Sequence, residues 1–248
     1  MPPLVIAHRG DSAHRPENTL ASFMSALEVG AELVELDVHV TRDGHVVVIH
    51  DPTVDRTTNG AGHVLEMALA EVRALSAGFP SRFGDAYAGE RVPLLAEVLG
   101  LLKGRARVMI EMKHESVTDD AEGGLEARTI FEVRRAGMAS EVALISFDRR
   151  ALLRCRELAP EMARGHLFYR ATVDEVLAGA REIGSGLVMP EKGMLSEELR
   201  DRTREAGIWL ATWVVDDPAE LLALRRFDLY GIGSNRPGAL IEALQEGS

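Results

Sequence analysis

The 248-residue chain has 46% hydrophobic residues, 27% charged residues and a formal net charge of −11 at pH 7. A chain of this length buries about three quarters of the surface that its unfolded form exposes, which argues against a disordered or low-complexity protein. The acidic balance argues against a nucleic-acid-binding protein, because such proteins need a basic face to displace counterions from phosphates. An anionic ligand would have to be attracted by local cations or by a bound metal ion.

Targeting and redox features predict a cytoplasmic protein. The first residues enter an apolar strand with no charged region before it, so we expect no signal peptide. No run approaches the roughly 18 consecutive apolar residues that a membrane-spanning helix needs. The single cysteine, Cys155, cannot form an internal disulfide, which suits a reducing compartment. The sequence leaves the oligomeric state open between a monomer and a homodimer.

Short apolar runs alternate with amphipathic segments along the whole chain. In the first half the pattern predicts helices at 17–29 and 94–102, and strands at 4–8, 33–40, 46–50 and 108–113. In the second half it predicts strands at 142–146, 165–169, 186–189, 208–215 and 229–233. The helices predicted in that half are at 125–136, 149–158, 173–182, 197–206, 219–225 and 239–245.

This alternation predicts parallel βαβ units. About eight strand–helix pairs are enough to close a single (β/α)8 barrel, an α/β fold of roughly this length. A doubly wound open sheet is the alternative, but no Gly-x-Gly-x-x-Gly motif follows the first strand. The stretch 53–91 interrupts the rhythm with glycines and prolines. We expect it to be a small insertion on the active-site rim of one domain that spans 1–248.

Two of the predicted strands carry acidic residues on one face only. In the second strand every other residue is apolar, so Glu35 and Asp37 point together to the opposite face, the interior of a closed barrel. The strand near residue 110 places Glu111 and Lys113 on one face in the same way. Gathered carboxylates repel one another unless a cation joins them, and hard oxygen ligands suit Mg²⁺ or Ca²⁺. The alternative, ordinary polar positions on half-exposed strands, is weakened because two such strands carry the pattern.

Two histidines each end a predicted apolar run. His8 is followed by Arg9, and His50 is followed by Asp51. Barrel enzymes carry their chemistry at these carboxyl ends of the strands, whereas an isolated histidine is more often structural. Two imidazoles can share the acid and base work of phosphodiester cleavage, and the Arg9 guanidinium matches a phosphate. The sequence does not say which histidine is the acid and which is the base.

Several short motifs follow one another in a fixed order along the chain. They are His-Arg-Gly at 8–10, Pro-Glu-Asn-Thr at 16–19, Glu-Leu-Asp-Val at 35–38, His-Asp at 50–51, Ile-Glu-Met-Lys at 110–113 and Thr-Trp-Val at 212–214. Together they resemble the glycerophosphodiester phosphodiesterase family, and the resemblance covers nearly the whole chain.

The resemblance implies a metal-dependent barrel that hydrolyses a small-molecule glycerophosphodiester to sn-glycerol 3-phosphate and an alcohol, a reaction of lipid metabolism. It also implies an acid–base pair, a ligand set for Mg²⁺ or Ca²⁺, two phosphate-binding cations and an apolar wall for glycerol. By matching positions, the acid–base pair is His8 and His50, and the metal ligands are Glu35, Asp37 and Glu111. The phosphate-binding cations are Arg9 and Lys113, and the apolar wall is Trp213. For Trp213, plain packing in the core is an equally good interpretation.

Two short elements depart from the family's usual pattern. The family usually has Trp-Thr-Val-Asn where this chain has Trp-Val-Val-Asp at 213–216. It usually has Thr-Asp-Arg/Tyr-Pro where this chain has Ser-Asn-Arg-Pro at 234–237. We expect both elements on the far wall of the site, where they would affect substrate preference rather than the reaction.

Two other functions remain as alternatives. A phospholipase-D-like enzyme acting on lysophospholipids would need an apolar approach surface, and 5% aromatic residues argue against one. A barrel that binds phosphodiesters without cleaving them would tolerate loss of a histidine or a carboxylate, and the chain retains all five.

Overall fold

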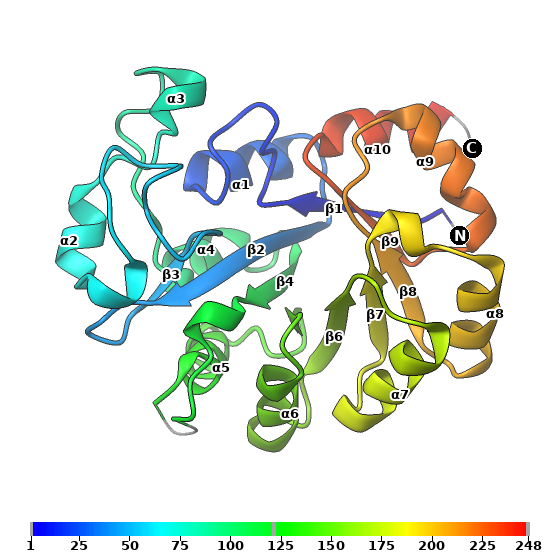
Figure 1. The fold of residues 1–248 in the computed structure, drawn as a ribbon. Coiled ribbons are helices and arrows are strands. Elements are labelled where there is room, and N and C mark those ends of the chain that lie inside the picture. Colours follow the sequence, from blue (N-terminus) through cyan, green and yellow to red (C-terminus); the bar gives the residue numbers. More distant parts are fainter. Residues whose placement is uncertain (1, 121–122, 247–248) are drawn as a thin grey trace.

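The computed structural model describes residues 2–120 and 123–246. Within these residues, eight parallel strands join edge to edge, and the pairing of β1 (Leu4–His8) with β2 (Leu33–Val40) closes the ring. Figure 1 shows the strands at the centre with helices around them. The expected (β/α)8 barrel is confirmed. A doubly wound open sheet is excluded because β1 is paired on both of its edges.

The barrel strands follow one another in space as they do in the sequence. After β2 the ring continues with β4 (Arg107–Met112), β5 (Val142–Ser146), β6 (Ala163–Phe168), β7 (Leu187–Pro190), β8 (Trp209–Thr212) and β9 (Gly231–Ser234). The short β3 (Val46–Val48) is antiparallel to the end of β2, beyond the part of β2 that pairs with β1. This hairpin returns the chain toward the barrel and delivers His50 to its carboxyl end.

Helices cover the outside of the ring. They are α1 (Leu20–Glu28), α4 (Leu95–Leu102), α5 (Leu125–Ala136), α6 (Arg149–Leu158), α7 (Val173–Ile183), α8 (Glu197–Glu205), α9 (Pro218–Leu224) and α10 (Pro237–Glu246). Among the described residues, no helix combines the length and the apolar character needed to cross a membrane.

The alternation within the strands separates an outer core from the barrel interior. Val34, Leu36 and Val38 of β2 pack in the layer beneath the helices, as the sequence predicts. Inside the ring, side chains that point inward form a second apolar cluster. Its buried members are Ile6, Leu33, Met109, Ile145, Leu167, Leu187, Met189 and Ala211.

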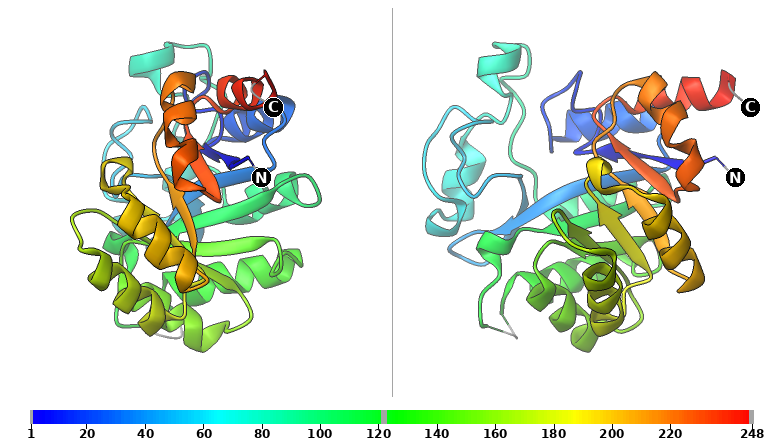
Figure 2. Two further views of the ribbon diagram at one scale, coloured as in Figure 1. Left: turned by 90° about the vertical axis from the view of Figure 1, so that its right-hand side faces the viewer. Right: turned by 45° about the vertical axis from the view of Figure 1, so that its right-hand side comes forward.

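The stretch 53–91 forms a small lobe with α2 (Leu69–Ala74) and α3 (Pro80–Phe83). It lies on the side of the molecule opposite the chain ends (Figures 1 and 2). A separate apolar cluster, which includes Val54 and Val72, joins it to β3. Arg56 of this stretch contacts side chains that follow β1 and β3, so the stretch borders the carboxyl end of the barrel.

We expect the turn after β1 to tolerate no side chain at Gly10. Its φ is +82°, and a Cβ there would lie 2.6 Å from the Ser22 carbonyl carbon of α1. Gly30 provides a matched control, because its φ is +85° but a Cβ would meet no atom within 4 Å. Gly30→Ala should lower the free energy of unfolding by about 1 kcal/mol and Gly10→Ala by about 2–4 kcal/mol. Urea denaturation measures both, and equal losses would contradict the close packing at Gly10.

Candidate active site

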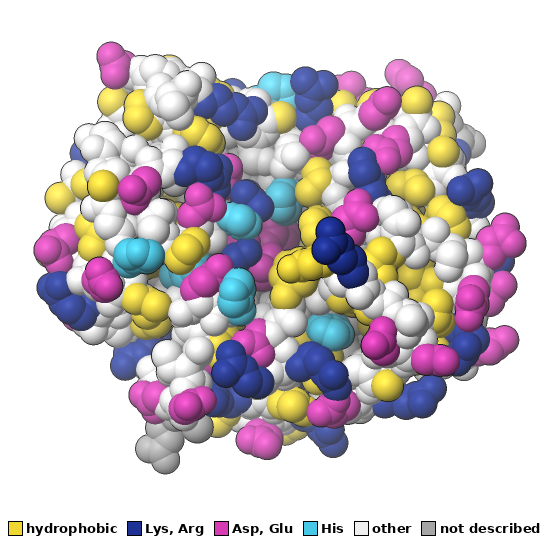
Figure 3. Space-filling model, viewed as in Figure 1, with side chains coloured by type: hydrophobic (Ala, Val, Ile, Leu, Met, Phe, Trp, Pro, Cys, Tyr) yellow, Lys and Arg dark blue, Asp and Glu magenta, His cyan; other side chains and the backbone are white. Residues whose placement is uncertain are grey.

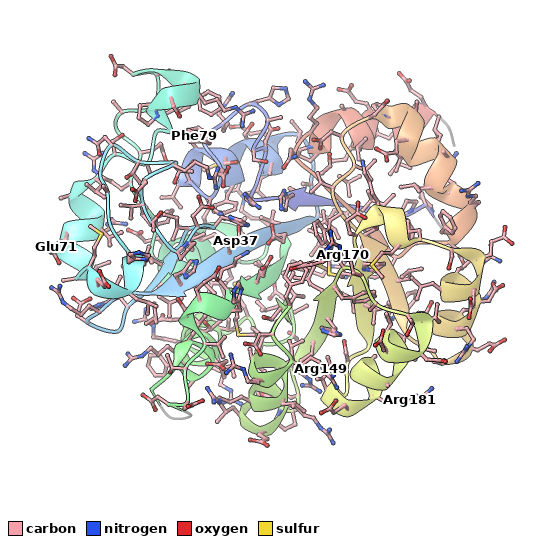
Figure 4. All side chains as sticks on the ribbon, in the orientation of Figure 1. Asp37, Glu71, Phe79, Arg149, Arg170 and Arg181 are labelled. Atoms are coloured by element: carbon pink, nitrogen blue, oxygen red, sulfur yellow. The ribbon has the colours of Figure 1, made fainter. Side chains whose placement is uncertain are left out.

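A cavity of about 170 Å³ lies at the carboxyl ends of the barrel strands. The predicted site residues that line it are His8, Arg9, Glu35, His50, Glu111, Lys113 and Trp213. Asp37 is fully buried and forms ion pairs with two of them. Figure 3 shows a central hollow in which acidic, basic and histidine side chains meet, and Figure 4 places Asp37 near the centre of the barrel. A larger hollow of about 620 Å³ between the β2–β3 hairpin and α5 contains none of the predicted residues.

Strand register brings the predicted residues together. His8 of β1 is the register partner of Glu35 in β2, and Asp37 is the register partner of Glu111 in β4. Glu35, Asp37 and Glu111 each offer a carboxylate oxygen, and these oxygens lie within 4.8 Å of one another. The three acidic residues predicted as ligands therefore form one cluster.

The three carboxylates differ in pKa because the cations of Arg9 and Lys113 stabilise the ionised form of Asp37. Burial alone would raise the pKa of Asp37, but Arg9 and Lys113 lower it below its usual range. Arg9 Nε lies 3.2 Å from Asp37 Oδ2, and Lys113 Nζ lies 3.5 Å from Asp37 Oδ1. Burial and the charges of Asp37 and Glu111 raise the pKa of Glu35 well above its usual value. Burial and Asp37 raise the pKa of Glu111 to about 7, although Lys113 Nζ is 2.7 Å from Glu111 Oε1.

The cluster fits a divalent cation. Among the described residues, Glu35 Oε1 and Asp37 Oδ1 are buried and accept no hydrogen bond. A buried acceptor without a hydrogen bond costs about 1–3 kcal/mol, and a bound cation would remove that cost. Carboxylate oxygens are hard ligands of the kind that Mg²⁺ and Ca²⁺ prefer.

Asn18 is a site residue that the sequence does not single out. The sequence places it in the Pro-Glu-Asn-Thr motif and inside the predicted helix at 17–29, but that helix is capped by Thr19 and begins at Leu20. Asn18 instead adopts a φ of +58° and donates from Nδ2 to Asp37 Oδ2 over 2.8 Å. Asparagine tolerates this left-handed backbone, but no local rule links the residue to a carboxylate 19 positions away.

His8 contacts an amide on one side and faces the carboxylates on the other. Its Nδ1 lies 2.7 Å from Asn235 Oδ1, and its Nε2 lies 4.0 Å from Glu35 Oε2. Burial, reinforced by the charge of Arg9, lowers the pKa of His8 to about 4. The imidazole is therefore neutral at pH 7.

His50 contacts a carboxylate instead. Its Nδ1 lies 2.6 Å from Asp51 Oδ1, and Asp51 in turn binds Arg56, whose Nε is 2.6 Å from Asp51 Oδ2. Arg56 also binds Glu17. Burial lowers the pKa of His50, while Asp51 opposes the shift. Buried His39 lies with its Nε2 3.1 Å from the His50 carbonyl oxygen, and so fixes the backbone at this point.

The two elements that depart from the family pattern contact each other. Asn235 Nδ2 donates to Asp216 Oδ2 over 2.9 Å, and Asn235 N donates to Asp216 Oδ1 over 2.7 Å. Through Asn235 the pair contacts His8. One of these residues therefore contacts a predicted catalytic residue, while their effect on substrate preference stays a prediction.

Trp213 both packs and lines the cavity. Its Nε1 donates to the Met189 carbonyl oxygen over 3.1 Å. Its ring meets Phe147 edge to face at 5.6 Å between centroids, and Phe147 lies 5.5 Å from exposed Tyr169. Packing in the core is therefore confirmed for Trp213, while its role as a wall for glycerol stays a prediction.

Residues 8–239 match the model of the Glycerophosphoryl diester phosphodiesterase family. This chain belongs to that family. It is 37% identical to a glycerophosphodiester phosphodiesterase from Caldanaerobacter subterraneus subsp. tengcongensis, over the full length of both chains. Membership confirms the family predicted from the motifs and the enzyme class, a phosphoric diester hydrolase.

Solved structures of the family share the fold over nearly the whole chain. A phosphodiesterase from Oleispira antarctica, in complex with the product sn-glycerol-3-phosphate, has a TM-score of 0.90 at 28% identity, covering 98% of this chain and 97% of that one. A glycerophosphodiester phosphodiesterase from Agrobacterium tumefaciens has a TM-score of 0.81 at 31% identity, covering 96% of this chain and 98% of that one.

We expect the carboxylate cluster to make the metal-free protein less stable as the pH rises. Glu111 has a pKa of about 7 in the folded protein against an ordinary value of 4.5. Between these values the folded state holds a proton that the unfolded chain has released, so the free energy of unfolding falls with increasing pH.

In chelator, wild type should therefore lose more stability between about pH 5 and about pH 8 than Glu111→Gln, in which this side chain cannot titrate. Urea denaturation of both proteins at the two pH values measures the difference. A parallel pH dependence would contradict the raised pKa of Glu111.

Proposed function

We propose that this protein hydrolyses glycerophosphodiesters to sn-glycerol 3-phosphate and an alcohol, with a divalent cation bound at the carboxylate cluster. The observation that carries the proposal is the small cavity in which two histidines and two cations lie beside a cluster of three carboxylates. Family membership and the product-bound relative support the same substrate class. The chain is acidic overall, so attraction of an anionic diester depends on these local positive charges.

The charged side of the cavity binds the phosphate in this proposal. When bound at Glu35, Asp37 and Glu111, Mg²⁺ or Ca²⁺ would polarise a phosphate oxygen and offset developing negative charge. Arg9 and Lys113 border the same space and supply fixed positive charge beside it.

The apolar side of the cavity takes the carbon atoms of the substrate in this proposal. Trp213 lines that side together with Ile145, Leu167 and Met189. In this proposal its ring contacts the carbon-bound hydrogens of glycerol. A polyol fits such a wall because its carbon face is apolar, while its hydroxyls turn toward the charged side.

The two histidines divide the proton transfers in this proposal. His8 donates its Nδ1 hydrogen to an amide oxygen, so Nε2 has a free lone pair and takes the proton of the attacking hydroxyl. His50 contacts the carboxylate of Asp51, which stabilises an imidazolium, and it gives a proton to the departing alcohol as the P–O bond breaks. The attacking hydroxyl belongs to the glycerol of the substrate, so this step leaves a cyclic phosphodiester, which water then opens to sn-glycerol 3-phosphate.

The first test is the release of glycerol 3-phosphate from glycerophosphocholine and glycerophosphoethanolamine, with Mg²⁺ or Ca²⁺ and again with chelator. We expect release that chelator abolishes. His8→Ala and His50→Ala should each lower kcat by about 10²- to 10⁴-fold with the fold retained, because each removes one proton transfer. His14→Ala changes an exposed histidine and should leave kcat unchanged.

The outcomes separate the alternatives. Substantial turnover by either folded histidine variant would exclude the two-histidine mechanism. No release by folded wild type with metal would exclude the proposed activity, and the same diesters should then be tested for binding without cleavage.

The second test concerns the cation. Mg²⁺ or Ca²⁺ should stabilise wild type by about 2.7 kcal/mol at a concentration 100-fold above the dissociation constant. Glu35→Gln keeps the shape of the side chain but removes a charge from the cluster, so the stabilisation should largely disappear. Glu198→Gln, on the exposed face of α8, is the matched control. Isothermal titration calorimetry measures binding directly, and an unchanged titration in Glu35→Gln would remove Glu35 from the ligand set.

A further inference from the structure

The orientation of His8 depends on a residue at the far end of the chain. His8 ends β1 and Asn235 follows β9, and these two strands are neighbours in the barrel, with Ala7 the register partner of Ser234. Asn235 Oδ1 lies 2.7 Å from His8 Nδ1. An amide oxygen only accepts hydrogen bonds, so His8 must carry its proton on Nδ1. The lone pair is then on Nε2, which faces the cavity and Glu35.

Asp216 decides which end of the Asn235 amide faces His8. A carboxylate only accepts hydrogen bonds, and Asp216 Oδ2 is 2.9 Å from the Asn235 side-chain nitrogen. If the Asn235 amide flipped, its oxygen would face Asp216 Oδ2 at this distance, and both atoms are acceptors. Asp216 Oδ1 is fixed in turn by Asn235 N at 2.7 Å and by Ser234 Oγ at 3.0 Å. The Asp216 carboxylate therefore fixes the orientation of the Asn235 amide, and that amide fixes which nitrogen of His8 carries the proton.

We propose that Asp216 and Asn235 are positioning residues that keep the proton of His8 on Nδ1 and its lone pair on Nε2. The role in turnover rests on the proposed function, whereas the position of the proton does not. The family's usual pattern has an amide at the position of Asp216 and a carboxylate at that of Asn235. Because the two side chains touch, the departures at positions 216 and 235 amount to an exchange within one hydrogen-bonded pair.

Asp216→Asn is the decisive variant. The oxygen of the new amide would stay where the Asp216 carboxylate accepts from Ser234 and from the backbone of residue 235, which places the new nitrogen against Asn235. The Asn235 amide should then flip and present its own nitrogen to His8, which would move the proton of His8 to Nε2. We expect kcat to fall by about 10- to 1,000-fold with little change in KM, because the base loses its lone pair.

The double variant D216N/N235D restores the arrangement with the groups exchanged. The new carboxylate at position 235 would accept both from the new amide at position 216 and from His8. The proton of His8 then returns to Nδ1, and most of the lost kcat should be regained. Asp217→Asn is the matched control, because Asp217 is the exposed neighbour that caps α9 and asparagine caps a helix equally well. Asp217→Asn should change neither kcat nor the position of the proton on His8.

The second readout is the position of the proton itself. Long-range ¹H–¹⁵N correlation spectra of ¹⁵N-histidine-labelled protein, with His8 assigned by its loss in His8→Gln, distinguish the two neutral forms. We expect Nδ1–H in wild type and in the double variant, and Nε2–H in Asp216→Asn. A merely structural role would alter stability or KM but would not move this proton.

Several results would overturn the proposal. These are Nε2–H on His8 in wild type, an Asp216→Asn variant that keeps kcat, a loss of kcat with the proton still on Nδ1, or a double variant that regains nothing. If Asp216→Asn does not fold, the wild-type spectrum still decides where the proton lies. If wild type cleaves no glycerophosphodiester, the proposed function fails while the spectra still test the pair.

Discussion

Three carboxylates buried at one end of a barrel are the constraint on which the rest of the site depends. Taking each ionised group out of water costs several kcal/mol, and mutual repulsion adds to that cost. Arg9 and Lys113 offset part of it, and the cluster with both cations still carries one negative charge when all groups are ionised. A divalent cation reverses that sign, which makes the cavity attractive to a phosphodiester anion.

The need to offset these charges accounts for the backbone around β1. Arg9 follows the strand with a φ of +56°, and its guanidinium reaches Asp37 from that conformation. Gly10 then allows the chain to approach α1 closely, and Asn18 returns with its own left-handed φ to bind Asp37. Left-handed residues cost free energy. Here two of them place the side chains that contact the most buried carboxylate.

The part of this site that depends on alternation along one strand can be predicted from the sequence. The pattern in β2 places Glu35 and Asp37 inside the barrel, and the pattern in β4 adds Glu111, because a strand repeats every two residues. The parts that depend on contacts between distant segments cannot be predicted in this way. Asn18 falls inside a predicted helix and yet binds Asp37, and Asn235 contacts a residue 227 positions away. Strand ends show the same limit, because the sequence predicts that the last strand but one continues to residue 215, whereas β8 ends at Thr212. Beyond Thr212 the pairing with β7 continues only as a single bridge between Trp213 and Glu191, and the Trp213 side chain lines the cavity. Tertiary contacts outweigh local strand preference at this end.

The two histidines differ in the group that each one contacts and in the group that lies behind that contact. His50 touches a carboxylate that is backed by a cation, whereas His8 touches an amide that is backed by a carboxylate. A carboxylate directly on His8 would place a fourth negative charge beside the cluster, since His8 Nε2 is already 4.0 Å from Glu35. That charge would add to the repulsion that Arg9 and Lys113 only partly offset. An amide at position 235 orients the imidazole without adding charge, and the carboxylate at 216 fixes the amide from one hydrogen bond further away.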